Sequence, residues 1–430
     1  MSAEIIALLL LAIFVGLIVI RVPIGFALGM AGILGLILMD QSFMMFPQTL
    51  ISGINNFALM AIPFYVLLGV ALEKTNISES LIKLADEIFG FLPGGMAVGA
   101  VISSMLFATA SGSGPATVAA IGSITIPQME KRGYSKRFAV GTSASAGALG
   151  PIIPPSIPLI IYGVVAEESI VRLFFAGLGA GILFAFLLCL VCVIKAKAEK
   201  VPLSQERPSL KRILAAFWRA KVALAAPVIV LGGIYAGVFT PTEAGAIGSI
   251  YVLAAGLIIT RSLTLRDLYD CFAKTASTSA MIMFVIAVAY LFAWLLSAAR
   301  VPHLAAESML AIASNKVVFL LLVNLLFLFI GSVLDTPAAI VIIVPILLPV
   351  AEQFAIHPIH FGTVVVVNFV IGYITAPFGY NLFVAKSITD MSMEEVTLSV
   401  IPFLLVALAG LGLITFIPEI SLFFPQLFMG

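Results

Sequence analysis

The sequence has few charged residues. Asp, Glu, Lys and Arg make up only 10% of the 430 residues and hydrophobic residues 62%, whereas a soluble domain carries about 25% charged residues. The polar side chains are too few to cover a water-facing surface of this size, which excludes an assembly of soluble domains. The 22 basic and 21 acidic residues give no basic excess, which argues against a nucleic-acid-binding protein. Three cysteines are too few for a disulfide framework.

Motifs of enzymes are also missing. The sequence contains neither HExxH nor GxxxxGK[ST], and the Gly- and Ser-rich stretches at 111–114 and 141–145 do not match GxSxG. His357 and His360 lack acidic or cysteine companions at metal-binding spacing, so we expect both at a helix end on the surface. We therefore expect no enzyme and no organic cofactor. Without a nucleotide site, energy must come from an ion gradient or from a separate ATPase.

The hydrophobic segments predict an all-α polytopic membrane protein. A membrane helix needs about 20 mostly apolar residues. By this criterion the sequence predicts ten spanning helices, at residues 3–20, 22–39, 56–74, 137–165, 170–195, 219–238, 242–260, 276–299, 358–386 and 398–418. The first segment has no basic region and no cleavage site, so we expect a retained helix rather than a signal peptide.

Two further apolar stretches are too long for one helix. They are interrupted by Ser111–Pro115 and by Asp335–Pro337, and we predict two re-entrant helical hairpins, at 94–131 and 315–354. Each hairpin would enter to mid-membrane and return on the same side. Three amphipathic pieces, at 76–91, 263–274 and 302–314, are predicted to lie in the membrane interface.

The basic residues give the orientation. If the loop at 195–221 is cytoplasmic, all of the 22 Lys and Arg residues lie inside except Arg172, Arg300 and Lys316, as the positive-inside rule requires. We therefore expect both termini outside the cytoplasm, which is the periplasmic side if the protein lies in a bacterial inner membrane.

Backbone-breaking residues recur at one fixed offset. The following pairs are each 222 positions apart: Pro115 and Pro337, Pro127 and Pro349, Glu130 and Glu352, Gly150 and Gly372, Pro155 and Pro377. Because an odd number of spans separates equivalent points, the second copy is inverted in the membrane. The prediction is a first repeat at 1–196, a cytoplasmic connector at 197–218 and a second repeat at 219–430. Inverted repeats with broken helices are typical of secondary transporters, whose binding site lies near the midplane.

The first hairpin tip and the first helix break gather oxygen atoms. Gly and Pro at 111–115 and at 147–155 free backbone carbonyls, which need partners inside the membrane. Hydroxyl groups add to these carbonyls, at Thr109, Ser111, Ser113, Ser143 and Ser145. Carbonyl and hydroxyl oxygens suit a hard cation of low charge, and sodium fits better than a transition metal.

The second copy repeats this chemistry. Its tip has Gly331, Ser332, Asp335 and Thr336, and its break has Gly372, Thr375, Ala376, Pro377 and Phe378. Two equivalent sites predict at least two coupling ions. Asp335 has two interpretations, a functional acid in the membrane and an N-cap of the returning helix, and one side chain can fill both roles. Glu243 is better explained as the acid of a capping box.

Several motifs together resemble one transporter family. The stretches Ser111–Gly122, Gly150–Ser156, Pro241–Gly245 and Asp335–Pro337 are similar to the large membrane subunit of tripartite ATP-independent periplasmic (TRAP) transporters, over essentially the whole chain. The resemblance implies an elevator-type carrier, similar to the ion transporter superfamily, that couples sodium entry to uptake of a carboxylate or sulfonate solute such as sialic acid or a C4-dicarboxylate. It also implies a small four-helix membrane subunit, expected here as a separate chain, and a periplasmic substrate-binding protein.

Site roles carried over from the family remain expectations. One sodium site would use Thr109, Ser111, Gly147 and Gly150, and the other Gly331, Gly372, Thr375 and the Phe378 carbonyl. Ser111, Ser113 and Asp335 would face the substrate or its ions. The hairpins and broken spans would form a moving transport domain, and spans 3–39 and 219–260 a scaffold.

Three rival functions stay open from sequence alone. One is a stand-alone homodimeric cation-coupled anion carrier without a binding protein. The others are a membrane-embedded hydrolase that uses Ser111 or Ser143, which lacks a plausible His base, and a passive channel.

Overall fold

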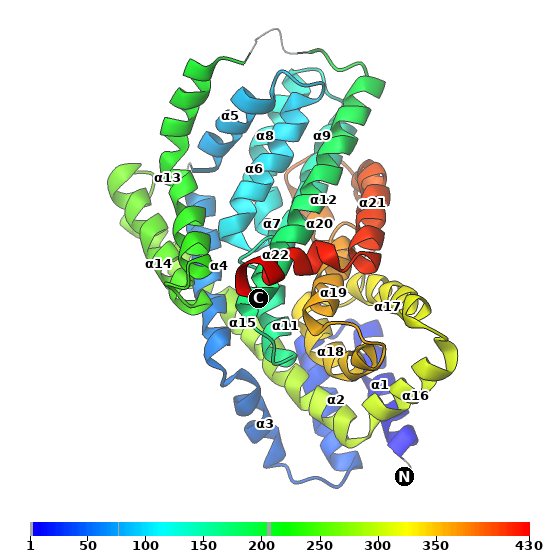
Figure 1. The fold of residues 1–430 in the computed structure, drawn as a ribbon. Helices are drawn as coiled ribbons and strands as arrows, with labels where there is room; N and C mark the ends of the chain where they lie inside the picture. Colours follow the sequence, from blue (N-terminus) through cyan, green and yellow to red (C-terminus); the bar gives the residue numbers. More distant parts are fainter. Residues whose placement is uncertain (1–2, 76, 204–207) are drawn as a thin grey trace.

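The computed structural model describes residues 3–75, 77–203 and 208–430, and these residues form helices and no strands (Figure 1). The predicted helix at 76–91 and the predicted connector at 197–218 include residues 76 and 204–207, which lie outside the described residues. In chain order the first half contains α1 (Ala3–Val19), α2 (Ile24–Leu38), α3 (Met45–Ile54), the 3-10 turn η1 (Phe57–Met60), α4 (Ala61–Lys74), α5 (Ile77–Phe89), α6 (Gly95–Ser111), α7 (Gly114–Thr117), the π-helical turn η2 (Val118–Gly122), α8 (Ser123–Lys131), α9 (Lys136–Ala146), α10 (Leu149–Ile152), α11 (Ile157–Val165) and α12 (Ile170–Ala198).

The second half contains α13 (Leu210–Tyr235), α14 (Pro241–Ala254), the π-helical turn η3 (Ala255–Ile259), α15 (Leu265–Ala298), α16 (Val301–Ile312), α17 (Lys316–Gly331), α18 (Thr336–Gln353), α19 (Pro358–Gly372), α20 (Tyr380–Ser387), α21 (Met393–Phe416) and α22 (Glu419–Met429). In the described part of the chain, eight helical runs are long and apolar enough to cross a membrane. Shorter apolar helices accompany them, α1, α2, α6, α16, α17 and α19 among them. The prediction of an all-α polytopic membrane protein is confirmed at this level, and the count of ten spans stays a prediction.

One predicted element is wrong. The piece at 263–274 is not a separate interfacial helix, because α15 runs without a break from Leu265 to Ala298. Thr264 starts this helix through a capping box with Asp267, and the sequence from 265 to 298 contains no Gly or Pro to interrupt it. Two helices, α3 and α22, were not predicted at all.

Both breaker segments form turns between helices. In the first hairpin α6 ends at Ser111, Gly112 has a left-handed φ of 59°, and the returning limb continues from Gly114 to Lys131 through the π-helical turn η2. Gly is suited to this conformation because it has no Cβ. In the second hairpin α17 ends at Gly331 and α18 begins at Thr336. The inverted arrangement of the two copies stays a prediction.

The helices pack as two groups. In the first group α15 packs against α2, α3 and α4, and α14 packs against α4 and α13. In the second group α12 packs against α6, α19, α21 and α22, and α9 packs against α21. Both hairpins meet the first group, through α4 with α6 and through α15 with α18. In Figure 1, α1–α3 extend toward the lower end, whereas α6, α8 and α9 lie toward the upper end.

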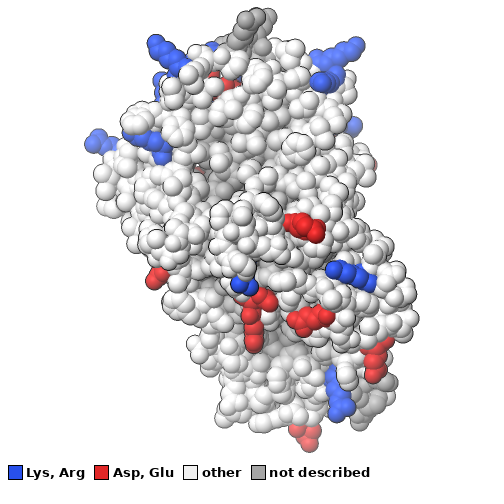
Figure 2. All heavy atoms as spheres, viewed as in Figure 1, with Lys and Arg blue, Asp and Glu red and all other residues white. Residues whose placement is uncertain are grey.

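Charge is distributed unevenly between the two ends. Figure 2 shows Lys and Arg gathered around the upper end, where α12 ends and α13 begins in Figure 1, and acidic residues mostly over the lower half. This is the asymmetry that the positive-inside rule describes if the upper end faces the cytoplasm.

The expectation that both histidines lie on the surface is wrong for His360. His357 does cap α19, since its Nδ1 accepts a hydrogen bond from the backbone N–H of Ile359 at 3.1 Å. His360 is buried, with Nδ1 3.3 Å from the Ser421 hydroxyl and Nε2 3.2 Å from the Thr415 carbonyl. The reason is α22, the unpredicted C-terminal helix that carries Ser421.

Candidate functional site

A small cavity lies where the two hairpin tips meet. Its volume is about 160 Å³. It is lined by residues of tip 1 (Gly112–Pro115), of tip 2 (Asp335 and Pro337), of the two breaks and of α15: Gly112, Ser113, Gly114, Pro115, Pro151, Ile157, Pro158, Met281, Ile282, Asp335, Pro337, Tyr373 and Tyr380. Ser113 and Asp335, which are 222 positions apart in the sequence, therefore face one space.

Hydroxyl groups order tip 1. The Ser111 Oγ lies 3.2 Å from the Thr117 Oγ1, and Thr117 donates to the Ser113 carbonyl at 2.7 Å. The Ser113 Oγ accepts from the backbone N–H of Ala116 at 3.4 Å and so caps the returning limb. Ser111 and Thr117 are buried, whereas Ser113 is partly exposed to the cavity. Thr117 was not predicted as a site residue from the sequence, although it lies close after tip 1.

The first break packs onto tip 1 through backbone. A Cβ added at Gly150 would lie 2.5 Å from the Ser113 carbonyl carbon and 2.6 Å from its oxygen, and one at Gly112 would lie 2.7 Å from the Pro155 carbonyl oxygen. Only residues without a side chain allow two backbones to approach so closely. The structure thus brings the backbone of tip 1 against Gly150 and the Pro155 carbonyl, and Gly114 against Gly147. Gly147 and Gly150 are two of the expected ligands of the first sodium site, which stays a prediction.

Asn381 is a further residue at this place that sequence reasoning missed. It is fully buried, and its Nδ2 donates to the Ala144 carbonyl at 3.0 Å. Its Oδ1 has no hydrogen-bond partner in the described part of the chain. A Cβ at Gly114 would lie 2.8 Å from this Oδ1, and one at Gly147 would lie 2.9 Å from Nδ2. An amide of the second half of the chain therefore sits between the first tip and the first break, with an acceptor oxygen available.

The second tip and break also touch. A Cβ added at Gly372 would lie 2.3 Å from the Gly331 carbonyl oxygen and 2.5 Å from its carbon. The second break is more open than the first, because Phe378 is 55% exposed whereas residues 147–156 are all buried. The structure brings Gly331 and Gly372 together as expected and leaves the Phe378 side chain outside the packed region.

The acids behave as helix caps. The Asp335 carboxylate accepts the backbone N–H of Thr336 at 3.1 Å and caps α18, which confirms that interpretation. Glu243 forms the predicted capping box with Thr240. Asp335 also lines the tip cavity, and because the capping bond uses only one carboxylate oxygen, the side chain keeps acceptor capacity.

Two predicted cation ligands already donate their hydroxyl protons to the chain. Thr109 donates to the Leu106 carbonyl at 2.6 Å and Thr375 to the Ile371 carbonyl at 2.8 Å. A hydroxyl that donates in this way keeps lone pairs for a cation, so both remain suitable ligands. The described residues contain no group of three or more His, Cys, Asp or Glu side chains that could hold a metal ion.

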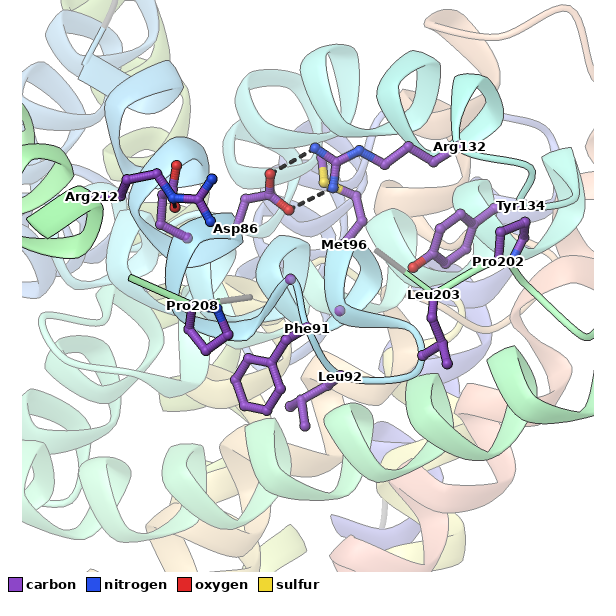
Figure 3. Close-up of a pocket in the computed structure, with 13 residues that line it drawn as sticks. Asp86, Phe91, Leu92, Met96, Arg132, Tyr134, Pro202, Leu203, Pro208 and Arg212 are labelled. Carbon is purple, nitrogen blue, oxygen red and sulfur yellow. Dashed lines mark hydrogen bonds and ion pairs between the residues drawn. The ribbon is translucent and has the colours of Figure 1, made fainter. Parts of the chain in front are cut away.

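A larger cavity, of about 530 Å³, lies elsewhere. Figure 3 shows it at the end of α5, where Arg132 makes a two-pronged ion pair with Asp86 at 2.6 and 2.7 Å. Arg212 of α13 lies 3.3 Å from Glu87 in the same region. None of the predicted site residues is among the described residues that line this cavity. We interpret it as a junction of α5, the first hairpin and α13.

Hairpins whose tips meet broken helices around one cavity are typical of secondary transporters. The fold agrees with this class. The crystal structure of the Alcanivorax borkumensis YdaH transporter covers 88% of this chain and 88% of its own, with a TM-score of 0.63 at 16% identity. The structure of Neisseria gonorrhoeae MtrF, described with a class of antimetabolite efflux pumps, has a TM-score of 0.58 at 15% identity and covers 85% of this chain and 82% of its own.

Residues 11–420 match the family described as "Tripartite ATP-independent periplasmic transporter, DctM component", and the chain belongs to this family. The C4-dicarboxylate TRAP transporter large permease protein of Pseudomonas aeruginosa is 38% identical, over 93% of this chain and 94% of that protein. The sialic acid TRAP transporter large permease protein of Vibrio cholerae is 34% identical, over 97% and 98%. The isethionate TRAP transporter permease protein of Oleidesulfovibrio alaskensis is 41% identical over 94% of this chain, which spans 64% of that protein's length.

Proposed function

We propose that this chain is the large permease subunit of a sodium-coupled carrier that takes up a small organic acid anion. The relatives carry the names of three acids at 34–41% identity, a C4-dicarboxylate, sialic acid and isethionate. Their shared chemistry is a carboxylate or sulfonate on a small polar body. We therefore propose an anion of this class as the substrate. We expect the binding protein that delivers it to select the individual acid.

The tip cavity carries the proposal. It is lined by the two hairpin tips, and α18 begins at Thr336 beside it, so the positive end of this helix dipole faces the space. Such an end attracts an anion by about 0.3–1 kcal/mol. The Ser113 hydroxyl and the phenol groups of Tyr373 and Tyr380 belong to residues of the same lining and supply neutral donors.

Asp335 explains why a cation is needed. A carboxylate in this lining repels an anionic substrate unless a positive charge lies between them. Sodium bound by carbonyl and hydroxyl oxygens of the tips supplies that charge and stabilises the packing of tip against break. Binding of the ion then favours binding of the anion, and by linkage the anion favours the ion to the same degree.

The contact between the two helix groups fits an elevator movement. A Cβ added at Gly69 of α4 would lie 3.2 Å from the carbonyl oxygen of Ser111, the residue before tip 1, so the end of α6 lies against a helix of the first group. We propose that the second group, with both hairpins, slides along α4 and α15 as the transport domain. The small membrane subunit would hold the first group in the inner membrane, and a periplasmic protein would deliver the substrate.

Thermal unfolding of the purified chain tests sodium coupling without any substrate. NaCl replaces KCl at constant ionic strength, and a ligand bound only to the folded state adds about 2.7 kcal/mol when present at 100 times its Kd. We expect a saturable rise with sodium that is weaker in Ser111→Ala and in Asp335→Asn. Ser387→Ala, which changes an exposed hydroxyl bonded to the Val384 carbonyl, is the control and keeps the full rise.

Reconstitution with both partners tests transport itself. Sodium-dependent, saturable uptake that requires the binding protein supports the proposal. Uptake without a binding protein would favour the stand-alone carrier instead, and conduction that does not saturate would favour a channel. A flat response to sodium in every variant would refute sodium as the coupling ion.

A further inference from the structure

Three cavities adjoin one another between the hairpin tips and one end of the molecule. The tip cavity shares Ser113, Pro115, Ile157 and Ile282 with a second cavity of about 340 Å³. The second cavity shares Glu73 and Ala119 with a third, of about 460 Å³. Because neighbouring cavities share wall residues, the three lie in a row along the returning limb of the first hairpin, and we call this row the passage.

The passage runs toward two helices of the basic end of the molecule, α5 and α8. Its far wall includes Ser78 and Glu79 of α5 and Ser123 of α8. In Figure 1, α5 and α8 lie toward the upper end, around which Figure 2 shows Lys and Arg gathered. If this end faces the cytoplasm, as the positive-inside rule predicts, the passage lies on the side of release.

One ion pair crosses the middle of this passage. The Lys274 Nζ of α15 lies 2.8 Å from the Glu73 Oε2 of α4. These two are the charged members of the described lining of the second cavity, whose other residues are apolar or carry hydroxyl groups. Their side chains are 54% and 31% exposed, so water reaches both. An ion pair in contact with water is held weakly and exchanges partners readily.

We propose that Lys274 and Glu73 form a charge-selective gate for release of the substrate anion to the cytoplasm. This inference rests on the proposed function. A carboxylate or sulfonate that leaves the tip cavity replaces the Glu73 carboxylate on the Lys274 ammonium, and Glu73 re-forms the pair once the anion has moved on.

The neighbouring lysine provides a matched control. Lys74 follows Glu73 directly and pairs with Asp270 at 3.4 Å and Asp267 at 3.5 Å, also between α4 and α15. It is not among the described residues that line any of the three cavities. Lys74→Gln therefore removes a similar bridge between the same helices without changing the charge of the passage.

Chemical labelling tests the gate independently of transport. Ala119→Cys places a thiol in the wall shared by the second and third cavities, in a full-length chain whose Cys189, Cys192 and Cys271 are changed to Ala. Anionic and cationic methanethiosulfonate reagents, added to vesicles from the cytoplasmic side, report the local charge through the ratio of their rates. Removing one charge at about 8 Å in water changes this ratio about fivefold.

We expect Lys274→Gln to lower the anionic-to-cationic ratio, Glu73→Gln to raise it, and Lys274→Arg and Lys74→Gln to leave it unchanged. In reconstituted vesicles Lys274→Gln should lower the maximal uptake rate with little change in sodium-induced stabilisation, and Lys274→Arg should restore that rate. An unchanged labelling ratio in Lys274→Gln overturns the proposal, and so does full uptake in that variant, which would make the pair a link between α4 and α15 only. If the unmodified chain does not transport at all, the proposed function fails, while labelling still decides whether the passage is charge-selective.

Discussion

The contact between Gly331 and Gly372 gives a sharp test of the second cation site. In Gly372→Ala the new Cβ would lie 2.3 Å from the Gly331 carbonyl oxygen and 2.5 Å from its carbon. Favourable contacts need about 3.5 Å, so the second tip and the second break must separate by about 1 Å. Both obstructing atoms are backbone, and no side-chain rotation can relieve the overlap.

The expected change in the stability of Gly372→Ala follows from two opposing effects. Overpacking of this kind destabilises by about 1–3 kcal/mol. Replacing Gly by Ala near the end of α19 returns at most about 1 kcal/mol through helix propensity. We therefore expect a modest loss of stability in KCl, of about 1–2 kcal/mol. The larger effect should be on the response to sodium, because a shift of about 1 Å spoils cation coordination that depends on distance.

The assay is thermal unfolding in NaCl against KCl for the unmodified chain, Gly372→Ala and Gly412→Ala. Gly412 lies on α21, and a Cβ there would have no atom of the described residues within 4 Å, so this control adds the same methyl group where nothing obstructs it. We expect Gly412→Ala to keep the full sodium response and Gly372→Ala to lose most of it. A folded Gly372→Ala protein with an undiminished sodium response would refute the reasoning that this backbone contact shapes a cation site.

Three further predictions concern other contacts. Asn381→Ala should weaken sodium-dependent stabilisation, because it removes the amide that bonds to the Ala144 carbonyl. A sodium titration followed by thermal unfolding measures the apparent Kd for sodium, and an unchanged Kd would contradict this prediction. Gly69→Val should block uptake in reconstituted vesicles, because the new side chain would obstruct the movement of tip 1 past α4, but it should preserve the sodium response. Gly16→Val is the control and should transport normally, because a Cβ at Gly16 meets no atom of the described residues within 4 Å. Asn368→Val should lower the free energy of unfolding by about 1–3 kcal/mol in NaCl and KCl alike, since it breaks the buried hydrogen bond of 2.8 Å to Asn324. A loss of stability seen only in NaCl would instead place Asn368 in the ion site.

Much of the site was visible in the sequence because breakers mark it. Ser, Gly and Pro at 111–115 and Asp-Thr-Pro at 335–337 interrupt apolar segments, and local chemistry alone predicts turns there. The structure places Ser113 and Asp335 in one cavity and Gly331 against Gly372, as this interpretation requires. Capping by Asp335 and Glu243 was equally predictable, since a cap involves only a few neighbouring residues.

Other features could not be predicted, for different physical reasons. Asn381 joins the site through a bond to a residue 237 positions away, and nothing near it in the sequence distinguishes it from a solvated Asn. His360 is buried by α22, a helix whose short apolar sequence gives no sign of what it covers. The prediction at 263–274 was wrong because its charged residues indicated a separate interfacial helix, whereas α15 continues through them.

The sequence by itself determined that the chain is a helical membrane protein, where its helices break, and which oxygen-bearing residues stand at the breaks. These follow from composition and from backbone chemistry that acts within a few residues. Only the tertiary structure decided which breaks touch, that Asn381 lies between Gly114 and Gly147, and that Glu73 and Lys274 face each other across a passage. Apolar helices look alike in sequence whether they face lipid or protein, so the partners of each helix are fixed only by close packing of surfaces far apart in the chain.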